Sequence, residues 1–114
     1  MLALCDKQPI GIDIEFIDRK IDFLEIGRTV FTENEMLHIQ NAQEKERGQL
    51  FFNFWTAKEA YLKMLGVGMS LDPKKVSLEI IDGRPISSSA DGYPTAKLTF
   101  IDLQHKGAIC CISV

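Results

Sequence analysis

Two short stretches of the chain carry acidic and basic side chains at spacings that could support chemistry. They are QPIGIDIEFI at 8–17, with Asp13 and Glu15, and LFFNFWTAKEAYLKMLGVGM at 50–69, with Lys58, Glu59 and Lys63. Three carboxylates without a histidine or cysteine suit a hard cation, magnesium above all, which keeps waters and prefers phosphate oxygens. Two lysines beside them suit a polyanionic substrate. The set therefore predicts a magnesium-dependent phosphate or pyrophosphate site.

The acidic pair must be positioned by its own segment, 8–17. Apolar and acidic side chains alternate there, which predicts a β-strand. Ile12, Ile14 and Phe16 would face one way and the two carboxylates the other. Carboxylates at adjacent positions on one face repel each other unless a cation lies between them. The alternative interpretation is that they form the solvated outer face of an edge strand.

The basic pair and Glu59 belong to a predicted helix from Leu50 to Leu65, whose apolar residues recur at three- and four-residue spacing. Its apolar face comprises Leu50, Phe51, Phe54, Trp55, Tyr61, Leu62 and Leu65. Lys58 falls near the middle of that face, where an unpaired ammonium would be costly. Glu59 and Lys63 are four residues apart, so they lie together along its edge. The alternative is that these charges are ordinary helix surface.

Gly66-Val67-Gly68 follows the predicted helix. The first glycine is well placed as a C-cap. A lone GxG is weak evidence for a phosphate site, and helix termination followed by a tight loop explains it at least as well.

The other segments predict an α+β fold in one domain, 1–114, with a mainly antiparallel sheet packed against the long helix. Thr32 and Glu35 form a capping box that starts a second helix, and Gly48 is expected to mark a break before the long helix. Further elements are expected as a short helix at 21–31, strands at 76–80, 96–103 and 108–114, and a loop at 84–92. The last two strands should form a hairpin, and the almost wholly apolar final strand should lie centrally.

Composition narrows the functional classes. The net charge of −3 argues against nucleic acid as a partner. The three cysteines, Cys5, Cys110 and Cys111, form neither a disulfide framework nor a zinc motif, so we expect reduced thiols in a cytoplasmic protein. The first residues are too soon interrupted by charge for a signal peptide, and no apolar run is long enough to span a bilayer.

Two motifs in order resemble a known family. GIDIE at 11–15 together with FWTAKEAYLK at 54–63 resembles the paired signature of the 4′-phosphopantetheinyl transferase superfamily, and Phe31-Thr32-x-x-Glu35 resembles a weaker intervening motif of that family. The motifs resemble the C-terminal half of the surfactin-synthetase-activating type. The length resembles that of the holo-acyl-carrier-protein synthase type.

The resemblance implies the fold of this family, a single 4′-phosphopantetheinyl-transferase-like domain at 1–114. It also implies an activity, the transfer of the phosphopantetheine arm of coenzyme A to a serine of an apo carrier protein. It also implies residue roles. Asp13, Glu15 and Glu59 would hold magnesium, and Glu59, or a water that it holds on the metal, would take the serine proton. Lys63 would neutralise phosphate charge, and Lys58 would contact the phosphates or support the site. Gly66 and Gly68 would assist coenzyme A binding.

The resemblance further implies an apo acyl or peptidyl carrier protein as partner, in fatty acid, polyketide or peptide biosynthesis. Because the motifs of one type stand on a chain with the length of the other, we expect a homo-oligomer, dimer or trimer, to complete the site. The alternative is a non-catalytic half-domain that binds coenzyme A, a carrier protein or a separate first half. Neither membrane nor nucleic acid is expected as a partner.

Overall fold

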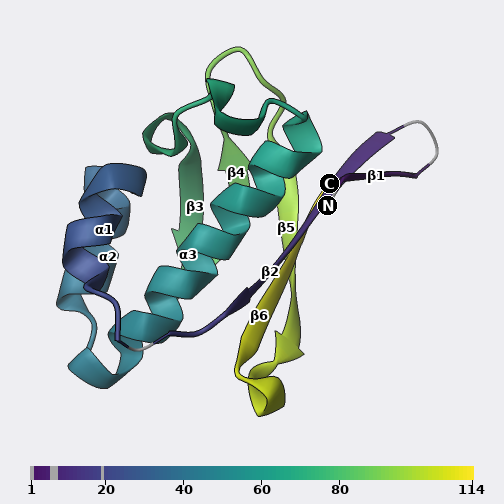
Figure 1. Ribbon diagram of the computed structural model, residues 1–114. Coiled ribbons are helices and arrows are strands. Elements are labelled where there is room, and N and C mark those ends of the chain that lie inside the picture. The colour runs from purple at the N-terminus through teal and green to yellow at the C-terminus, as the bar shows by residue number, and fades with distance from the viewer. Residues whose placement is uncertain (1, 6–7, 19) are drawn as a thin grey trace.

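The computed structural model describes residues 2–5, 8–18 and 20–114 of the chain. Six antiparallel strands form a sheet in the order β1-β2-β6-β5-β4-β3. The strands are β1 (Leu2–Cys5), β2 (Gln8–Phe16), β3 (Ser77–Ile81), β4 (Arg84–Ser89), β5 (Ala96–Leu103) and β6 (Ala108–Ser113). The helices are α1 (Phe23–Val30), α2 (Glu33–Asn41), α3 (Glu44–Leu65) and the short 3-10 turns η1 (Gly68–Ser70), η2 (Pro73–Lys75) and η3 (Gln104–Lys106). In Figure 1, α3 crosses one face of the sheet, and α1 and α2 lie beside its N-terminal half.

The predicted α+β class is confirmed, and the strand around the acidic pair forms as β2. β5 and β6 form the expected hairpin, and β6 lies between β2 and β5. The segment 84–89 was expected to be a loop but forms β4. Pro85 and Ser88 are buried but lie three residues apart, so the segment lacks the strict alternation that predicts a strand. The strand is held by pairing to β3 and β5. β1 was not predicted; it pairs with the first half of β2.

The short helix expected at 21–31 forms as α1, and the capping box of the second helix is confirmed, but the expected break at Gly48 is wrong. The capping box is present, because the Thr32 hydroxyl accepts from the Glu35 amide at 3.3 Å and a Glu35 carboxylate oxygen accepts from the Thr32 amide at 3.1 Å. Gly48 does not break a helix, since α3 begins at Glu44 and runs through it. Gly48 is instead a contact point: a Cβ there would lie 3.0 Å from Cζ of Phe23.

The core lies between α3 and the sheet. The predicted apolar face of α3 is buried or half-buried along its length, and Phe52, Ala57, Ala60 and Met64 are buried as well. The helix is therefore covered over a broader arc than its amphipathic pattern suggested. None of the described helices has the length and apolarity to cross a membrane. Cys110 and Cys111 are free and buried, and the Cys5 side chain lies outside the described residues.

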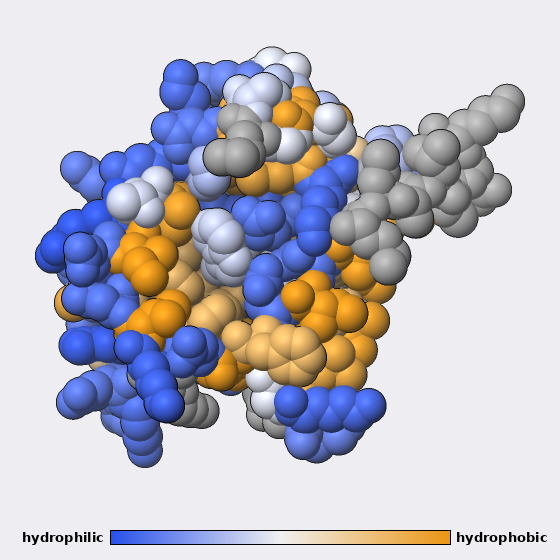
Figure 2. Space-filling model, in the orientation of Figure 1, coloured by the Kyte–Doolittle hydropathy of each residue, from blue (hydrophilic) through white to orange (hydrophobic). Residues whose placement is uncertain are grey.

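The two faces of β2 have the reverse of the usual polarity. Asp13 is 4% exposed, whereas Ile14 and Phe16 are 51% and 70% exposed. Ile14 pairs with Cys110 of β6, and Cys110 pairs with Ile101 of β5, which is also exposed. The carboxylates thus point to the helix side of the sheet, and apolar side chains occupy the open side. Figure 2 shows further apolar surface over the strands at the lower right.

Candidate active site

β2 and the C-terminal half of α3 bring the predicted acidic and basic residues together. The shortest contact is an ion pair in which Lys63 Nζ lies 2.5 Å from Asp13 Oδ1. Asp13 is buried, but the Lys63 side chain is 35% exposed, so the pair lies where the interior meets solvent. The hydrogen bond from Lys63 to Asp13 raises the pKa of Lys63, which keeps this ammonium charged.

Gly11 allows the strand to approach the helix closely enough for that contact. A Cβ on Gly11 would lie 1.8 Å from the backbone oxygen of Ala60 and 2.5 Å from the backbone nitrogen of Met64. Both obstructing atoms belong to the helix backbone and cannot rotate away. The backbones of β2 and α3 are therefore in direct contact two residues before Asp13.

We expect Gly11→Ala to lower the free energy of unfolding by at least about 3 kcal/mol, because the strand must separate from α3 to admit one methyl group. Gly48→Ala is the matched control. It adds the same methyl group against the ring of Phe23 at 3.0 Å, and it gains about 1 kcal/mol of helix propensity. Urea unfolding measures both. Equal stability of the two variants would show that the contact between Gly11 and the backbone of Ala60 leaves room for a methyl group.

Glu15 and Glu59 complete a crowded acidic group around Asp13. Burial and the neighbouring Asp13 carboxylate raise the pKa of Glu15 to about 7, and a hydrogen bond from the Trp55 side chain acts in the opposite direction. Burial and Asp13 also raise the pKa of Glu59, which Lys63 partly lowers. The alternative of a solvated acidic face on β2 is therefore wrong for Asp13, since its carboxylate is buried on the helix side.

The donor set fits magnesium in its chemistry. Asp13 Oδ2 is buried and has no hydrogen-bond partner in the described part of the chain, and the carboxylates beside it repel one another. Within residues 2–5, 8–18 and 20–114, no three His, Cys, Asp or Glu side chains lie close enough to enclose a metal ion. Magnesium does not require such an enclosure, because proteins commonly hold it by one or two carboxylates with water and substrate phosphate.

The raised pKa of Glu15 predicts a pH dependence of stability without metal. Between pH of about 4.5 and 7 the folded state holds more protons at Glu15 than the unfolded state, so stability falls as pH rises through that window. Glu15→Gln removes the free-energy cost of ionising this half-buried carboxylate. Because Glu15 is half-buried and screened by solvent, we expect Glu15→Gln to gain about 1 kcal/mol over the wild type at pH 8 and almost nothing at pH 5.

Urea unfolding in the presence of a metal chelator measures this difference, with exposed Glu46→Gln as the control. A stability gain for Glu15→Gln that is the same at pH 5 and pH 8 would contradict the assignment.

The structure places Lys58 away from this group, which corrects the expectation that Lys58 contacts phosphates. Its side chain is 0% exposed. Its ammonium donates to the carbonyl oxygens of Val30, Pro73 and Val76 at 2.8–2.9 Å and pairs with Glu35 at 2.6 Å. A lysine enclosed in this way cannot reach a ligand at β2. Of the two roles that the family resemblance implied, only support of the site fits these contacts.

Gly66 ends α3 as expected. Its φ of 69° is left-handed, and its amide donates to the carbonyl oxygens of Leu62 and Lys63. Gly68 also has a positive φ, and a Cβ on either glycine would meet no heavy atom within 4 Å. Both glycines are accounted for by backbone conformation, and their part in ligand binding stays a prediction.

Sequence reasoning missed two residues that shape the site, Gly11 and Glu35. Gly11 was noticed as part of a motif, but the approach of a helix backbone to it leaves no local signature. Glu35 was assigned to the capping box and to a weaker motif of the family, but not to an ion pair. A signal for its second role did exist: a lysine predicted within an apolar face needs a buried anionic partner, and Glu35 is that partner.

Comparisons with known proteins identify the family and the fold. The sequence profile of the 4′-phosphopantetheinyl transferase superfamily matches residues 9–112. The 4′-phosphopantetheinyl transferase Sfp of Bacillus subtilis is 32% identical over 113 residues, which cover 96% of this chain and 50% of that protein. The 4′-phosphopantetheinyl transferase gsp of Aneurinibacillus migulanus is 43% identical over 69 residues, or 60% of this chain and 28% of that protein.

Among solved structures, a holo-(acyl-carrier-protein) synthase from Bacillus anthracis, in complex with CoA (3′,5′-ADP), has a TM-score of 0.74 at 23% identity and matches over 91% of both chains. The holo-(acyl-carrier-protein) synthase of Thermotoga maritima has a TM-score of 0.69 at 17% identity and covers 91% of this chain and 60% of that one. These likenesses concern the fold. The present chain spans half the length or less of the two curated relatives described above.

Proposed function

This chain belongs to the 4′-phosphopantetheinyl transferase superfamily, and we propose on that premise that it transfers the 4′-phosphopantetheine group of coenzyme A to a serine of an apo acyl or peptidyl carrier protein. The observation that carries the proposal is the approach of Asp13 on β2 to Lys63 on α3, with Glu15 and Glu59 beside them. A buried carboxylate with one unpartnered oxygen, at the edge of solvent and next to a cation, suits a site for a metal and a pyrophosphate.

In the proposed reaction, the serine oxygen attacks the phosphorus that carries the pantetheine arm. The bond from that phosphorus to the oxygen of the adenosine portion breaks, and adenosine 3′,5′-bisphosphate leaves. One or two of the carboxylates of Asp13, Glu15 and Glu59, together with water and the pyrophosphate, would hold a magnesium ion, which would supply a Lewis acid for the pyrophosphate.

The chain's own groups act on protons and charge. Glu59 takes the proton from the serine hydroxyl. In the metal-free protein, burial and the Asp13 carboxylate raise the pKa of Glu59. Lys63, whose ammonium remains charged, offsets the negative charge that builds on the departing phosphate. Asp13 holds Lys63 in place through their ion pair.

We also propose that copies of the chain associate, as a dimer or trimer, to provide the wall of the coenzyme A site that β2 and α3 do not supply. The exposed apolar side chains of Ile14, Phe16 and Ile101 on the open side of the sheet support association, since a monomer gains nothing from exposing them together. The proposed location is the cytoplasm, which suits the free thiols of Cys110 and Cys111.

The second candidate is a non-catalytic half-domain that binds coenzyme A, a carrier protein or a separate first half. It is favoured by the observation that the chain matches only 50% of the Bacillus subtilis transferase. The two candidates differ in one respect that is simple to measure, whether the purified chain turns over coenzyme A.

The test is release of adenosine 3′,5′-bisphosphate, followed by chromatography. The chain is incubated with coenzyme A, magnesium and an apo carrier protein, after its folding and solution mass have been determined. Release that requires both the carrier and magnesium supports the transferase. No release by a folded, associated sample would overturn it in favour of the half-domain.

A further inference from the structure

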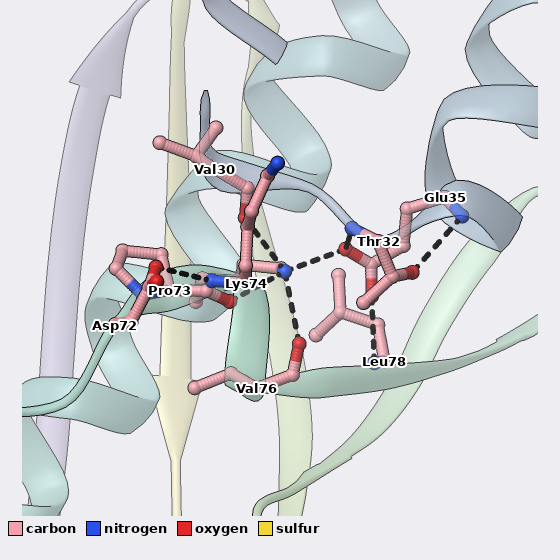
Figure 3. Close-up of polar contacts among 9 residues, drawn as sticks. Val30, Thr32, Glu35, Asp72, Pro73, Lys74, Val76 and Leu78 are labelled. Atoms are coloured by element: carbon pink, nitrogen blue, oxygen red, sulfur yellow. Dashed lines mark hydrogen bonds and ion pairs between the residues drawn. The ribbon is translucent and has the colours of Figure 1, made fainter. Parts of the chain in front are cut away.

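One buried cation joins four separate parts of the chain. Lys58 of α3 donates to carbonyl oxygens at the end of α1 (Val30), in η2 (Pro73) and just before β3 (Val76). It also pairs with Glu35 of α2, and its Nζ lies 5.4 Å from the ring centroid of Phe31. Figure 3 shows Val30, Pro73, Val76 and Glu35 arranged around this point.

Both carboxylate oxygens of Glu35 also have polar partners. Its Oε1 accepts from the Thr32 amide at 3.1 Å and lies 2.6 Å from Lys58 Nζ, and its Oε2 accepts from the Leu78 amide at 3.0 Å. Lys58 and Glu35 are 0% and 1% exposed. The Lys58–Glu35 pair therefore has polar partners at both ends and no access to solvent, so it takes no part in binding a ligand directly.

The pair has a directional effect on α3 that apolar packing lacks. The C-terminal half of α3 is buried on several sides, by Thr56, Ala57, Ala60, Tyr61, Leu62 and Met64 among others. Hydrophobic attraction of this kind is non-directional, so it favours burial of these side chains without specifying one rotation of the helix; the rotation is restricted by close packing and by polar contacts. Hydrogen bonds from one ammonium to three backbone carbonyls, in α1, in η2 and at the residue before β3, add a directional restraint on that rotation.

Glu59 immediately follows Lys58 in the helix, and Lys63 lies one turn beyond Glu59. With about 3.6 residues per turn, the rotation at Lys58 dictates where the next residue and the residue five positions on project. We propose that Lys58 and Glu35 are positioning residues. They set the rotation of α3 so that Glu59 and Lys63 face Asp13 on β2. As a statement about the active site, this inference rests on the proposed function.

The test is a double-mutant cycle on the Asp13–Lys63 contact, measured by urea unfolding in two backgrounds. In the wild type, the effects of Asp13→Asn and Lys63→Met on the unfolding equilibrium constant should be non-additive by about threefold or more. In Lys58→Met/Glu35→Gln, which removes both buried charges and keeps similar shapes, the non-additivity should fall toward onefold because Lys63 no longer meets Asp13.

A control separates positioning from stability. Thr32→Ala removes the hydroxyl that caps α2, and it leaves Lys58 and Glu35 in place. It should lower stability and keep the full coupling between Asp13 and Lys63. Coupling retained in the folded Lys58→Met/Glu35→Gln background, or lost equally in Thr32→Ala, would overturn the proposal. If the double variant does not fold, Glu35→Gln alone serves, and there the coupling should fall at least partly; full coupling would overturn the proposal.

The cycle needs neither coenzyme A nor turnover. Failure of the transferase assay with the predicted coupling pattern would therefore sink the proposed function and leave the orientation of α3 by Lys58 and Glu35 standing. In an active enzyme, the same double variant should lower kcat by about tenfold, because Glu59 and Lys63 act on the transition state. The KM for the carrier protein should change little.

Discussion

Asp13→Asn is expected to lower the rate of phosphopantetheine transfer by about 100-fold or more while the protein stays folded. The substitution keeps the shape of the side chain and removes its charge. Asp13 is the residue that contacts Lys63 and raises the pKa of both Glu15 and Glu59, so its charge influences every other member of the site.

Stability should change by less than about 1 kcal/mol, because two effects oppose each other. The variant loses an ion pair whose lysine is 35% exposed, and it relieves repulsion with two neighbouring carboxylates. Steady-state turnover and urea unfolding are measured together, with Asp91→Asn in an exposed turn as the control. Asp13→Asn with the turnover of the control would exclude Asp13 from the site.

Lys58→Met is expected to have the largest effect on stability, a loss of about 3–5 kcal/mol. The substitution preserves the length of the side chain but leaves Glu35, which is 1% exposed, as a buried carboxylate without its cation. Because protonation would relieve that charge, the loss should be smaller at pH 5 than at pH 8.

Two comparisons make the interpretation specific. Lys45→Met, at an exposed position in the first turn of the same helix, should change stability by less than about 0.5 kcal/mol. Adding Glu35→Gln to Lys58→Met should restore part of the loss, since no buried charge then remains unpaired. If adding Glu35→Gln to Lys58→Met lowered stability by as much as Glu35→Gln lowers it in the wild type, the two residues would not act as a pair.

The amino-acid sequence was sufficient for the parts of the fold that rest on local patterns. The alternation at 8–17, the capping box at Thr32 and the C-cap at Gly66 each depend on residues close together in the chain, and each formed as predicted. The approach of the acidic strand to the basic side of the long helix followed from pairing the two charged stretches. The superfamily was identified from the same residues.

The errors concern contacts between residues far apart in sequence. Glycine often marks the end of a helix, but at position 48 the missing side chain leaves room for the ring of Phe23 from α1. The serines of β4 gain a strand conformation from neighbours on both sides. Lys58 lies next to Glu59 in the chain and was assigned to the same site, although neighbouring helix residues project in different directions. Only the tertiary structure shows that one of them faces α1 and α2 while the other faces β2.

The inverted polarity of β2 also depends on tertiary structure. Alternation predicts that Ile12, Ile14 and Phe16 share a face, but it does not indicate which face meets the helix. Burying the apolar side would have been the usual outcome. The structure buries Asp13 instead and exposes Phe16. This arrangement serves the proposed chemistry at the expense of stability, because a carboxylate takes the buried position and an apolar ring faces solvent.

We propose that this chain transfers phosphopantetheine through the group formed by Asp13, Glu15, Glu59 and Lys63. The most direct measurement is the intact mass of an apo carrier protein after incubation with coenzyme A, magnesium and the purified, folded chain. We predict a mass increase of one phosphopantetheine group, located on a serine by peptide mapping, that is abolished when Asp13→Asn replaces the wild type. An unchanged carrier mass with the wild type, or an equal mass increase with Asp13→Asn, would contradict the claim.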